Sequence, residues 1–297
     1  MSGGPLDGVD TVRWHRLHHA YGAATDVPDQ LRALRGPDPD RRGAALSRLS
    51  GSVYHQGTRW QASQAVVPFL VALVDDAGTP DRAAVLELLR KVAIGDRRDD
   101  ELPFDPARAF AAADAFDSVR DGSLLLRFFA EEDEFTEDEI GVLDGAAVSW
   151  AADSYFGAAA CLDAVVSWVS DPDDEVAARA AALTAWFQPT AARVAALVAV
   201  PEGRTRVRAS ANLVLAHTPS ADPRVDLLLR ELTGSDSETV AVTAAVAEAY
   251  RRGGAVSEEA LSVLAGVAER DDLAAVAGWD RALRGFVMLA LRRLGLG

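Results

Sequence analysis

A sequence unit that recurs every 30 residues or so limits a chain to a few architectures, and this chain carries such a unit. Three copies align on Val176, Val207 and Val240, with the sequences DPDDEVAARAAAL, EGRTRVRASANLV and SDSETVAVTAAVA. The anchor valines are 31 and 33 residues apart, and PDPDRRGAALSRL near Asp40 reads as an earlier copy. Each copy opens with a polar turn and continues as an amphipathic helix rich in alanine and valine.

Helix pairs of this length cannot each bury their apolar face alone, so neighbouring pairs must stack. The repeat therefore predicts an all-α chain, folded as a right-handed α-solenoid of antiparallel helix pairs that forms one domain over residues 1–297. We expect four parts within it: a flexible lead and N-terminal capping helix at 1–25, the first helix pairs at 26–94, an irregular acidic insertion with helices at 95–139, and further pairs at 140–297.

The repeated turn and helix resemble a known family. An acidic turn containing proline leads into Val or Arg and then an apolar helix, as in Asp171, Pro172, Asp173, Val176, Arg179, Ala180 and Leu183. This pattern resembles the HEAT repeat, including the short bacterial form first described in phycobilisome lyases. The resemblance covers 26–93 and 140–294, and its spacing is shorter than the roughly 40 residues of larger HEAT units. Residues 95–139 match poorly.

Two further segments narrow the resemblance. WHRLHHAYGAATDVP and YHQGTRWQASQAVVPFL, together, are similar to a group of HEAT-like proteins of high-GC soil bacteria. Pro68, inside a predicted first helix, also fits the family and predicts a kink there. The resemblance implies the fold and carries no activity with it.

One stretch, residues 52–73, combines a helix end, a turn at Gly57 and the start of a second helix. Polar and aromatic side chains gather at this corner: Tyr54, His55, Gln56, Thr58, Arg59 and Trp60. Upstream, the pattern TVRWHRLHHAY predicts a short capping helix over 11–21. If that helix packs on the corner, seven residues share an aromatic and polar pocket suited to a peptide, a nucleobase or a small ligand: Trp14, His18, Tyr21, Tyr54, His55, Gln56 and Trp60.

The alternative for the same residues is a buried corner in which His55 and Gln56 satisfy backbone groups of the loop. His15 and His19 lie one helical turn apart in the predicted capping helix, but no third ligand is spaced to complete a metal site there. We therefore predict a surface or capping role for these imidazoles, and neither a metal nor a cofactor. No nucleophile elbow, phosphate-binding glycine loop, paired-cysteine zinc spacing or kinase signature occurs, so no catalytic residue is predicted.

The charge of the chain bears on its partners. The net charge is −15, and residues 61–170 carry 22 acidic against 8 basic residues. Such a field repels nucleic-acid phosphates and attracts a basic peptide or protein. Arg204, Arg206 and Arg208 form a short basic run, but alternate residues at a helix start make a poor phosphate stripe.

The densest acidic segment, EEDEFTEDE at 131–139, has two interpretations. It predicts a solvated loop followed by a helix start, because Thr136 and Glu139 are spaced as a capping box. A docking patch for a basic partner is the alternative.

Membrane and export signals are not visible in the sequence. The longest apolar run, 65–74, is too short to cross a bilayer, and the first residues lack a basic region followed by an apolar one. The single cysteine, Cys161, lies in an apolar helical stretch, where a buried and inert thiol is expected. These features predict a soluble, cytoplasmic protein with no membrane association.

Three functions follow as hypotheses, with the oligomeric state left open. The first is a protein-interaction scaffold that binds a peptide or protein partner, with a basic one fitting best, on a concave wall formed by the second helix of each pair. The second is an enzyme or small-ligand binder that uses the corner at 54–60. The third is a nucleic-acid binder of the kind found among HEAT-like glycosylases, which the net charge disfavours.

Overall fold

A computed structural model describes residues 4–130, 134–219 and 222–296. Within them the chain forms fifteen α-helices, short 3-10 turns and two hairpins of two-residue strands, so the prediction of an all-α protein is confirmed. None of the described helices combines the length and apolarity needed to cross a membrane.

The chain divides into two compact units, each described by itself. Unit 1 comprises residues 1–96 and 105–161, and unit 2 comprises residues 97–104 and 162–297. The single repeat array over 1–297 stays a prediction.

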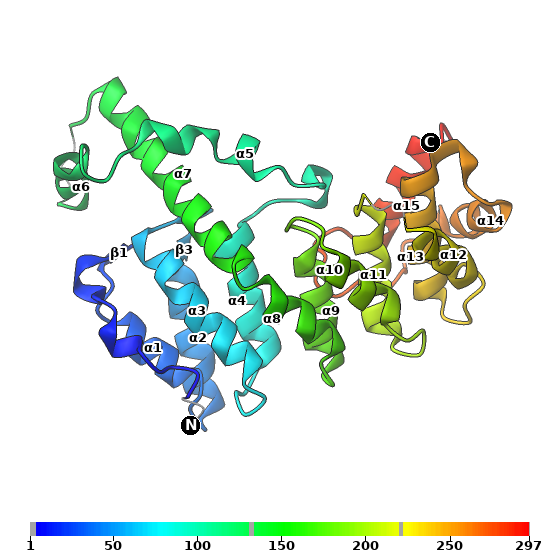
Figure 1. Ribbon diagram of the computed structural model, residues 1–297, viewed down its shortest axis with the longest axis horizontal. Helices are drawn as coiled ribbons and strands as arrows, with labels where there is room; N and C mark the ends of the chain where they lie inside the picture. The colour runs from blue at the N-terminus through cyan, green and yellow to red at the C-terminus, as the bar shows by residue number, and fades with distance from the viewer. Residues whose placement is uncertain (1–3, 131–133, 220–221, 297) are drawn as a thin grey trace. The chain divides into compact units, whose positions relative to one another are not determined.

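Unit 1 holds two β-hairpins and seven α-helices among its described residues. In chain order these are β1 (His18–His19), β2 (Gly22–Ala23), α1 (Val27–Ala33), α2 (Pro39–Val53), β3 (Tyr54–His55), β4 (Thr58–Arg59), α3 (Gln61–Asp75), α4 (Arg82–Ile94), α5 (Pro106–Ala109), α6 (Gly122–Phe129) and α7 (Glu137–Ala159). Helix α7 packs against α3 and α4, and α1 packs against α2 (Figure 1). Helix α3 stays helical through Pro68 and buries Val66, Leu70 and Leu73 completely.

The predicted helix over 11–21 is wrong. Residues Trp14–Arg16 form one 3-10 turn, and the chain then makes the hairpin of β1 and β2, with His19 opposite Gly22. Tertiary hydrogen bonds account for the difference. The His18 N–H donates to the Gln61 side chain, and the Ala20 N–H donates to the Ser52 carbonyl. Neither N–H is therefore left for a bond within a helix.

The turn at Gly57 is also a β-hairpin, because β3 pairs with β4 and His55 lies opposite Thr58. The two central residues, Gln56 and Gly57, have φ angles of 48° and 84°. Positive φ at both positions characterises a type I′ turn, whose twist matches that of paired strands. The turn expected at Gly57 is therefore a two-residue hairpin turn in which Gly57 is the second residue.

Backbone conformation accounts for three helix boundaries. Helix α5 stops at Ala109, and a 3-10 segment (Ala111–Ala115) follows. Helix α4 begins at Arg82, directly after Asp81, which adopts a left-handed φ of 52°. Helix α15 begins at Leu283, after Gly278, whose φ of 82° is incompatible with a helix.

Unit 2 consists of helices joined by short connections, apart from the longer segment 268–282 between α14 and α15. They are α8 (Leu162–Ser167), α9 (Asp174–Thr184), α10 (Ala191–Ala199), α11 (Thr205–Ala216), α12 (Pro223–Leu232), α13 (Glu238–Arg252), α14 (Glu258–Val267) and α15 (Leu283–Arg293). Polar side chains start them as the sequence suggests. Asp173, Asp222 and Ser257 each accept a hydrogen bond from a backbone N–H in the first turn of α9, α12 and α14.

The aligned repeat segments form α9, α11 and α13, which pack against one another in that order (Figure 1). The anchor residues Val176, Val207 and Val240 are completely buried. Polar bonds also connect equivalent positions. The Ser210 hydroxyl donates to the Ala178 carbonyl at 2.8 Å, 32 positions away, and the Asn212 amide donates to the Thr243 hydroxyl at 3.1 Å, 31 positions away. The sequence period therefore matches the spacing between neighbouring helices.

Arginine side chains cap the ends of helices in both units. Each lies on one helix and donates to carbonyls at or just beyond the C-terminus of a preceding helix: Arg42, Arg82, Arg193, Arg208 and Arg251. The last carbonyls of a helix lack partners within it and carry partial negative charge. A guanidinium with five N–H donors suits them better than a lysine, and the chain holds a single lysine, Lys91.

Candidate functional site

The seven residues predicted to share a pocket lie in unit 1 but in different surroundings. Trp14 belongs to the core. Its indole N–H donates to the Val9 carbonyl at 2.7 Å, and its ring lies 6.2 Å from that of Phe69. This hydrogen bond satisfies the indole nitrogen, and the ring is 5% exposed. Trp14 therefore has no free face for a ligand.

His18 and Trp60 join an aromatic cluster that the sequence did not reveal. The His18 ring stacks on Phe129 of α6 at 3.8 Å, and the Trp60 ring lies 6.3 Å from Phe128. Trp150 of α7 lies 6.1 Å from both Trp60 and Phe129. Helix α6 thus covers the side of the corner on which these two predicted residues lie, and its phenylalanines occupy space where a ligand would sit.

Tyr54 lies in a buried, charged environment. Its ring faces the Arg59 guanidinium, whose central carbon is 6.0 Å from the ring centre. Burial, and then the neighbouring Asp96 carboxylate, raise the pKa of the Tyr54 phenol well above its usual value. Arg59 itself is buried and donates to the Gly57 carbonyl at 3.3 Å. The phenol stays neutral at physiological pH, and these groups hold the second hairpin in place.

Tyr21, His55 and Gln56 are the predicted residues that reach solvent or its edge. The Tyr21 hydroxyl lies 3.3 Å from His55 Nδ1, and the two rings meet edge to face at 5.3 Å. Tyr21 is 70% exposed, and Gln56 is exposed at the hairpin turn. The structure therefore brings Tyr21 and His55 together at the hairpin tips, apart from the aromatic cluster.

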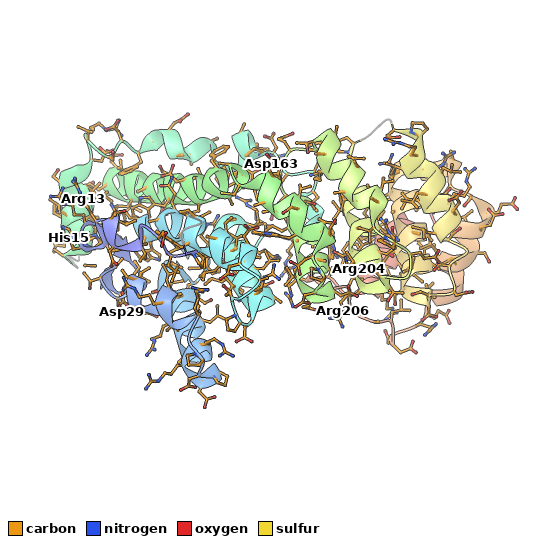
Figure 2. The ribbon with its side chains drawn as sticks, turned by 60° about the horizontal axis from the view of Figure 1, so that its bottom comes forward. Arg13, His15, Asp29, Asp163, Arg204 and Arg206 are labelled. Carbon is orange, nitrogen blue, oxygen red and sulfur yellow. The ribbon has the colours of Figure 1, made fainter. Side chains whose placement is uncertain are left out.

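His15 and His19 do not converge. His15 is exposed, near Arg13 in Figure 2, whereas His19 is buried. His19 Nδ1 accepts from the Tyr21 N–H at 3.1 Å, so its Nε2 carries the proton and donates to Asp26 at 2.9 Å. Across the described ranges, no three side chains of His, Cys, Asp and Glu are grouped as metal ligands would be.

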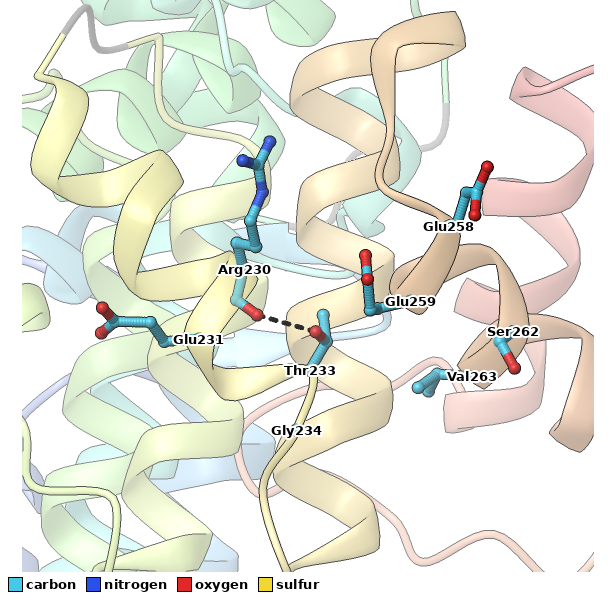
Figure 3. A pocket seen from close by; sticks show the side chains of 8 residues that line it. All are labelled: Arg230, Glu231, Thr233, Gly234, Glu258, Glu259, Ser262 and Val263. Carbon is cyan, nitrogen blue, oxygen red and sulfur yellow. Dashed lines mark hydrogen bonds between the residues drawn. The ribbon is translucent and has the colours of Figure 1, made fainter.

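A groove lies in unit 2, between the end of α12 and the start of α14. It measures about 640 Å³ and is lined by Arg230, Glu231, Thr233, Gly234, Glu258, Glu259, Ser262 and Val263 (Figure 3). Three carboxylates against one guanidinium make it acidic. The Thr233 hydroxyl turns inward and donates to the Arg230 carbonyl at 2.7 Å, as the dashed line in Figure 3 marks.

A buried carboxylate fixes the α14 side of this groove. Glu248 of α13 is 1% exposed and accepts from the Ser257 N–H at 2.9 Å and the Ser257 hydroxyl at 2.8 Å. The Nε atoms of Arg230 and Arg252 lie 4.0 and 3.8 Å from Oε1 of Glu248. Because Ser257 is the N-cap of α14, this network sets where Glu258 and Glu259 stand.

The second helices of unit 2 are covered by the chain itself. The connection between α14 and α15 lays Gly278 against α9, where an added Cβ would lie 2.6 Å from the Ala182 Cβ. The indole N–H of Trp279 donates to the Ser210 hydroxyl of α11 at 3.1 Å. The described part of α11 from Val207 to its end is buried throughout. This wall therefore already holds a segment of polypeptide.

The basic run at the start of α11 is neutralised. Arg204 and Arg206, which are labelled in Figure 2, pair with Asp174 at 2.6 Å and with Glu175, respectively. Arg208 is completely buried and donates to the Leu197 carbonyl, so the three arginines do not form a basic stripe. A phosphate backbone would have to displace the acidic partners.

The acidic segment 131–139 is described in part, since 131–133 lie outside the described residues. Its helix start is as predicted, because the Thr136 hydroxyl accepts from the Glu139 N–H and the Glu139 carboxylate accepts from the Thr136 N–H. Cys161 is half-buried, and burial raises the pKa of its thiol. A second groove, of about 280 Å³ between α2 and α4, contains Lys91.

Sequence reasoning missed the acidic groove, although part of its signal was present. Ser257 followed by Glu258 and Glu259 is a local pattern that also indicates a helix start, and the other wall comes from α12, earlier in the chain. Searches of protein-family models and of curated proteins find no match to this chain.

Proposed function

We propose that this chain is a cytoplasmic, HEAT-like helical-repeat scaffold, a solenoid of helix pairs, that binds a basic segment of a protein partner in the groove between α12 and α14. The observation that carries the proposal is the groove itself, about 640 Å³ in volume and lined by three glutamates against one arginine. Glu258 and Glu259 are exposed and held by a capped helix start, so their carboxylates are available to a lysine or arginine.

The repeat architecture supports a scaffold. Helices α9, α11 and α13 pack in sequence order, and ion pairs join residues about one repeat apart. Arg206 pairs with Glu175, 31 positions away, and Arg270 pairs with Glu238, 32 positions away. An array braced in this manner presents its grooves with little loss of conformational entropy on binding.

The location departs from the wall of second helices that repeat proteins commonly use. In unit 2 that wall carries Gly278 and Trp279 of the same chain, whereas the groove between the first helices α12 and α14 is open to solvent. The proposed partner therefore binds on the first-helix side.

A binding experiment with matched variants tests the proposal. Short synthetic peptides that differ only in carrying arginine or norleucine are titrated against the full chain at low and high salt. The double variant Glu258→Gln/Glu259→Gln should bind the arginine peptides about fivefold to tenfold more weakly, because two solvent-exposed charge pairs are lost.

The control is Asp236→Asn/Glu269→Gln, which removes two exposed acidic residues of unit 2 that do not line the groove. It should bind as the parent does. Equal affinity for arginine and norleucine peptides, or equal loss in both double variants, would contradict the proposal.

The second candidate function, a small-ligand binder or enzyme at the hairpin tips, keeps one supporting observation. Tyr21 and His55 form a hydrogen-bonded pair that includes a largely exposed ring. If this pair binds a ligand, His55→Ala should abolish binding of that ligand in a small-molecule screen while leaving the circular dichroism spectrum unchanged. A screen in which the parent and the variant give the same hits would remove this candidate.

A further inference from the structure

A cluster of aromatic and basic side chains in unit 2 contains buried polar atoms that have no hydrogen-bond partner among the described residues. His217 follows α11, Tyr250 lies near the end of α13, and Trp279 lies between α14 and α15. The His217 ring stacks near Trp279 at 6.0 Å and meets Tyr250 edge to face at 5.3 Å. The side chains of three residues from separate parts of unit 2 therefore lie next to one another.

Two polar atoms inside this cluster are buried without a partner among the described residues. They are Nε2 of His217 and the hydroxyl oxygen of Tyr250. A buried donor that lacks an acceptor costs free energy, and native structures contain few of them. These two atoms lie on neighbouring rings, so both are free to bond to the same ligand.

Basic side chains border the same rings. The Arg293 guanidinium lies over the Tyr250 ring, with its central carbon 3.8 Å from the ring centre, and has no carboxylate within 4.0 Å among the described residues. Arg281 is close by but is shared with the buried Asp99 at 2.7 Å. Burial, and then Arg293 and Arg281, lower the pKa of His217 to about 4, so the imidazole is neutral and one of its nitrogens can donate.

We propose that this cluster binds a small anionic group, a carboxylate or a phosphate, through the Arg293 guanidinium, the Tyr250 hydroxyl and Nε2–H of His217. A guanidinium with no carboxylate partner among the described residues, next to two neutral polar groups, suits an oxyanion, and the Trp279 ring stacks near His217 at 6.0 Å. The net charge of the chain is −15, so anion binding at this site depends on these local side chains and not on the overall charge. The site is separate from the acidic groove and does not depend on it.

Calorimetric titration of the full chain with sodium phosphate and with sodium acetate, at constant ionic strength set by sodium chloride, tests the proposal. Saturable binding of at least one of the two anions is expected, and the anion that saturates identifies the chemical class. Arg293→Gln should weaken it about tenfold, since a hydrogen bond to a charged group is lost. Arg292→Gln, which removes the adjacent exposed arginine, should leave binding within about twofold.

Tyr250→Phe separates a binding role from a structural one. The substitution keeps the ring but removes a hydroxyl with no partner, so the thermal midpoint should stay the same or rise while anion binding weakens about tenfold. Absence of saturable binding by the parent chain would overturn the proposal. So would equal weakening by Arg292→Gln and Arg293→Gln, or a Tyr250→Phe variant that is less stable yet binds normally.

Discussion

Unit 1 and unit 2 close the ends of their helices by the same means but join those helices differently. In both, arginines such as Arg82 and Arg193 reach from one helix to the terminal carbonyls of an earlier one. Unit 2 connects most of its helices through short turns, with the longer segment 268–282 as the exception, whereas unit 1 inserts two β-hairpins and the aromatic helix α6. The arginine caps are therefore common to both units, and the hairpins and α6 are particular to unit 1 among the described residues.

The difference lies in which residues fill each unit. The buried face of α9 and α11 is mostly alanine, valine and leucine, and small side chains let helices approach closely at every repeat. Unit 1 instead gathers Trp60, Phe128, Phe129 and Trp150 at one place. Large rings with fixed contacts tie together elements that a regular stack of helices would keep apart.

The largest effect should come from the arginine caps of unit 2. Arg208 is completely buried, and Nη1 donates to the carbonyls of Leu197 at 2.7 Å and Val200 at 3.2 Å. Arg208→Ala should cost about 4 kcal/mol of unfolding free energy, because these carbonyls and Asn212 lose their partner and a cavity remains. Urea unfolding measures this value.

Arg206→Ala, two residues away in the same helix, is the control for this experiment. Arg206 is exposed and forms a surface ion pair with Glu175, so the cost should be about 1 kcal/mol or less. Similar losses of unfolding free energy in the two variants would show that the buried arginine cap contributes no more stability than a surface ion pair. Hydrogen exchange should locate the damage from Arg208→Ala in α9 to α13.

The next largest effect tests the aromatic cluster of unit 1. Trp150→Ala should cost about 3 kcal/mol, since a buried indole leaves a cavity against Trp60 and Phe129. Phe156→Ala on the same helix should cost under about 1 kcal/mol, because Phe156 is 53% exposed. Equal thermal shifts for the two variants would mean that the cluster does not hold unit 1 together.

A pH titration of stability separates the units further. Burial, Arg293 and Arg281 lower the pKa of His217 from 6.5 to about 4 in the folded chain. The unfolded chain therefore binds more protons between these values, and stability is complete above pH 6.5 and falls as the pH drops toward 4. The loss attributable to His217 should be about 3 kcal/mol, because each unit of pKa difference corresponds to about 1.4 kcal/mol.

His217→Phe should remove this part of the pH dependence, and His15→Gln, at an exposed position of unit 1, should leave it intact. The measurement is the unfolding free energy of the three chains from pH 7 downward. Parallel curves for the parent and His217→Phe would refute the assignment.

The smallest effect compares one helix cap from each unit. Thr136 of unit 1 caps α7 through an exposed capping box, so Thr136→Ala should cost about 1 kcal/mol. Ser257 of unit 2 caps α14 and also donates to the buried Glu248 at 2.8 Å. Ser257→Ala should therefore cost about 1 kcal/mol more. Thermal unfolding of the two variants gives the comparison, and a larger cost at Thr136 would reverse it.

The sequence predicted what depends on local pattern. The burial of Val176, Val207 and Val240 followed from their period, and the capping box at Thr136 and Glu139 followed from spacing alone. The helix expected over 11–21 failed because its apolar spacing suits a helix, while the Ala20 N–H bonds to the distant Ser52 carbonyl. The spacing of residues within one segment does not predict a hydrogen bond to a distant part of the chain.

The candidate sites were harder to foresee for the same reason. The pairing of Tyr21 with His55 was within reach of the sequence, but the stacking of Phe129 on His18 joins residues from distant segments. The ion pair of Arg281 with Asp99 spans 182 positions. Gln56 and Gly57, a two-residue turn ending in glycine, were the signal for the second hairpin.

Gly278 gives experimental control over the wall of second helices. An added methyl group at this position would meet Ala182 of α9 at 2.6 Å, and φ there is 82°, so Gly278→Ala acts as a wedge beneath the crossing segment. The wedge alters no residue of the wall itself. We therefore expect a single methyl group at Gly278 to displace the segment around it from α9. The covered face of the second helices would then become accessible with its own side chains unchanged.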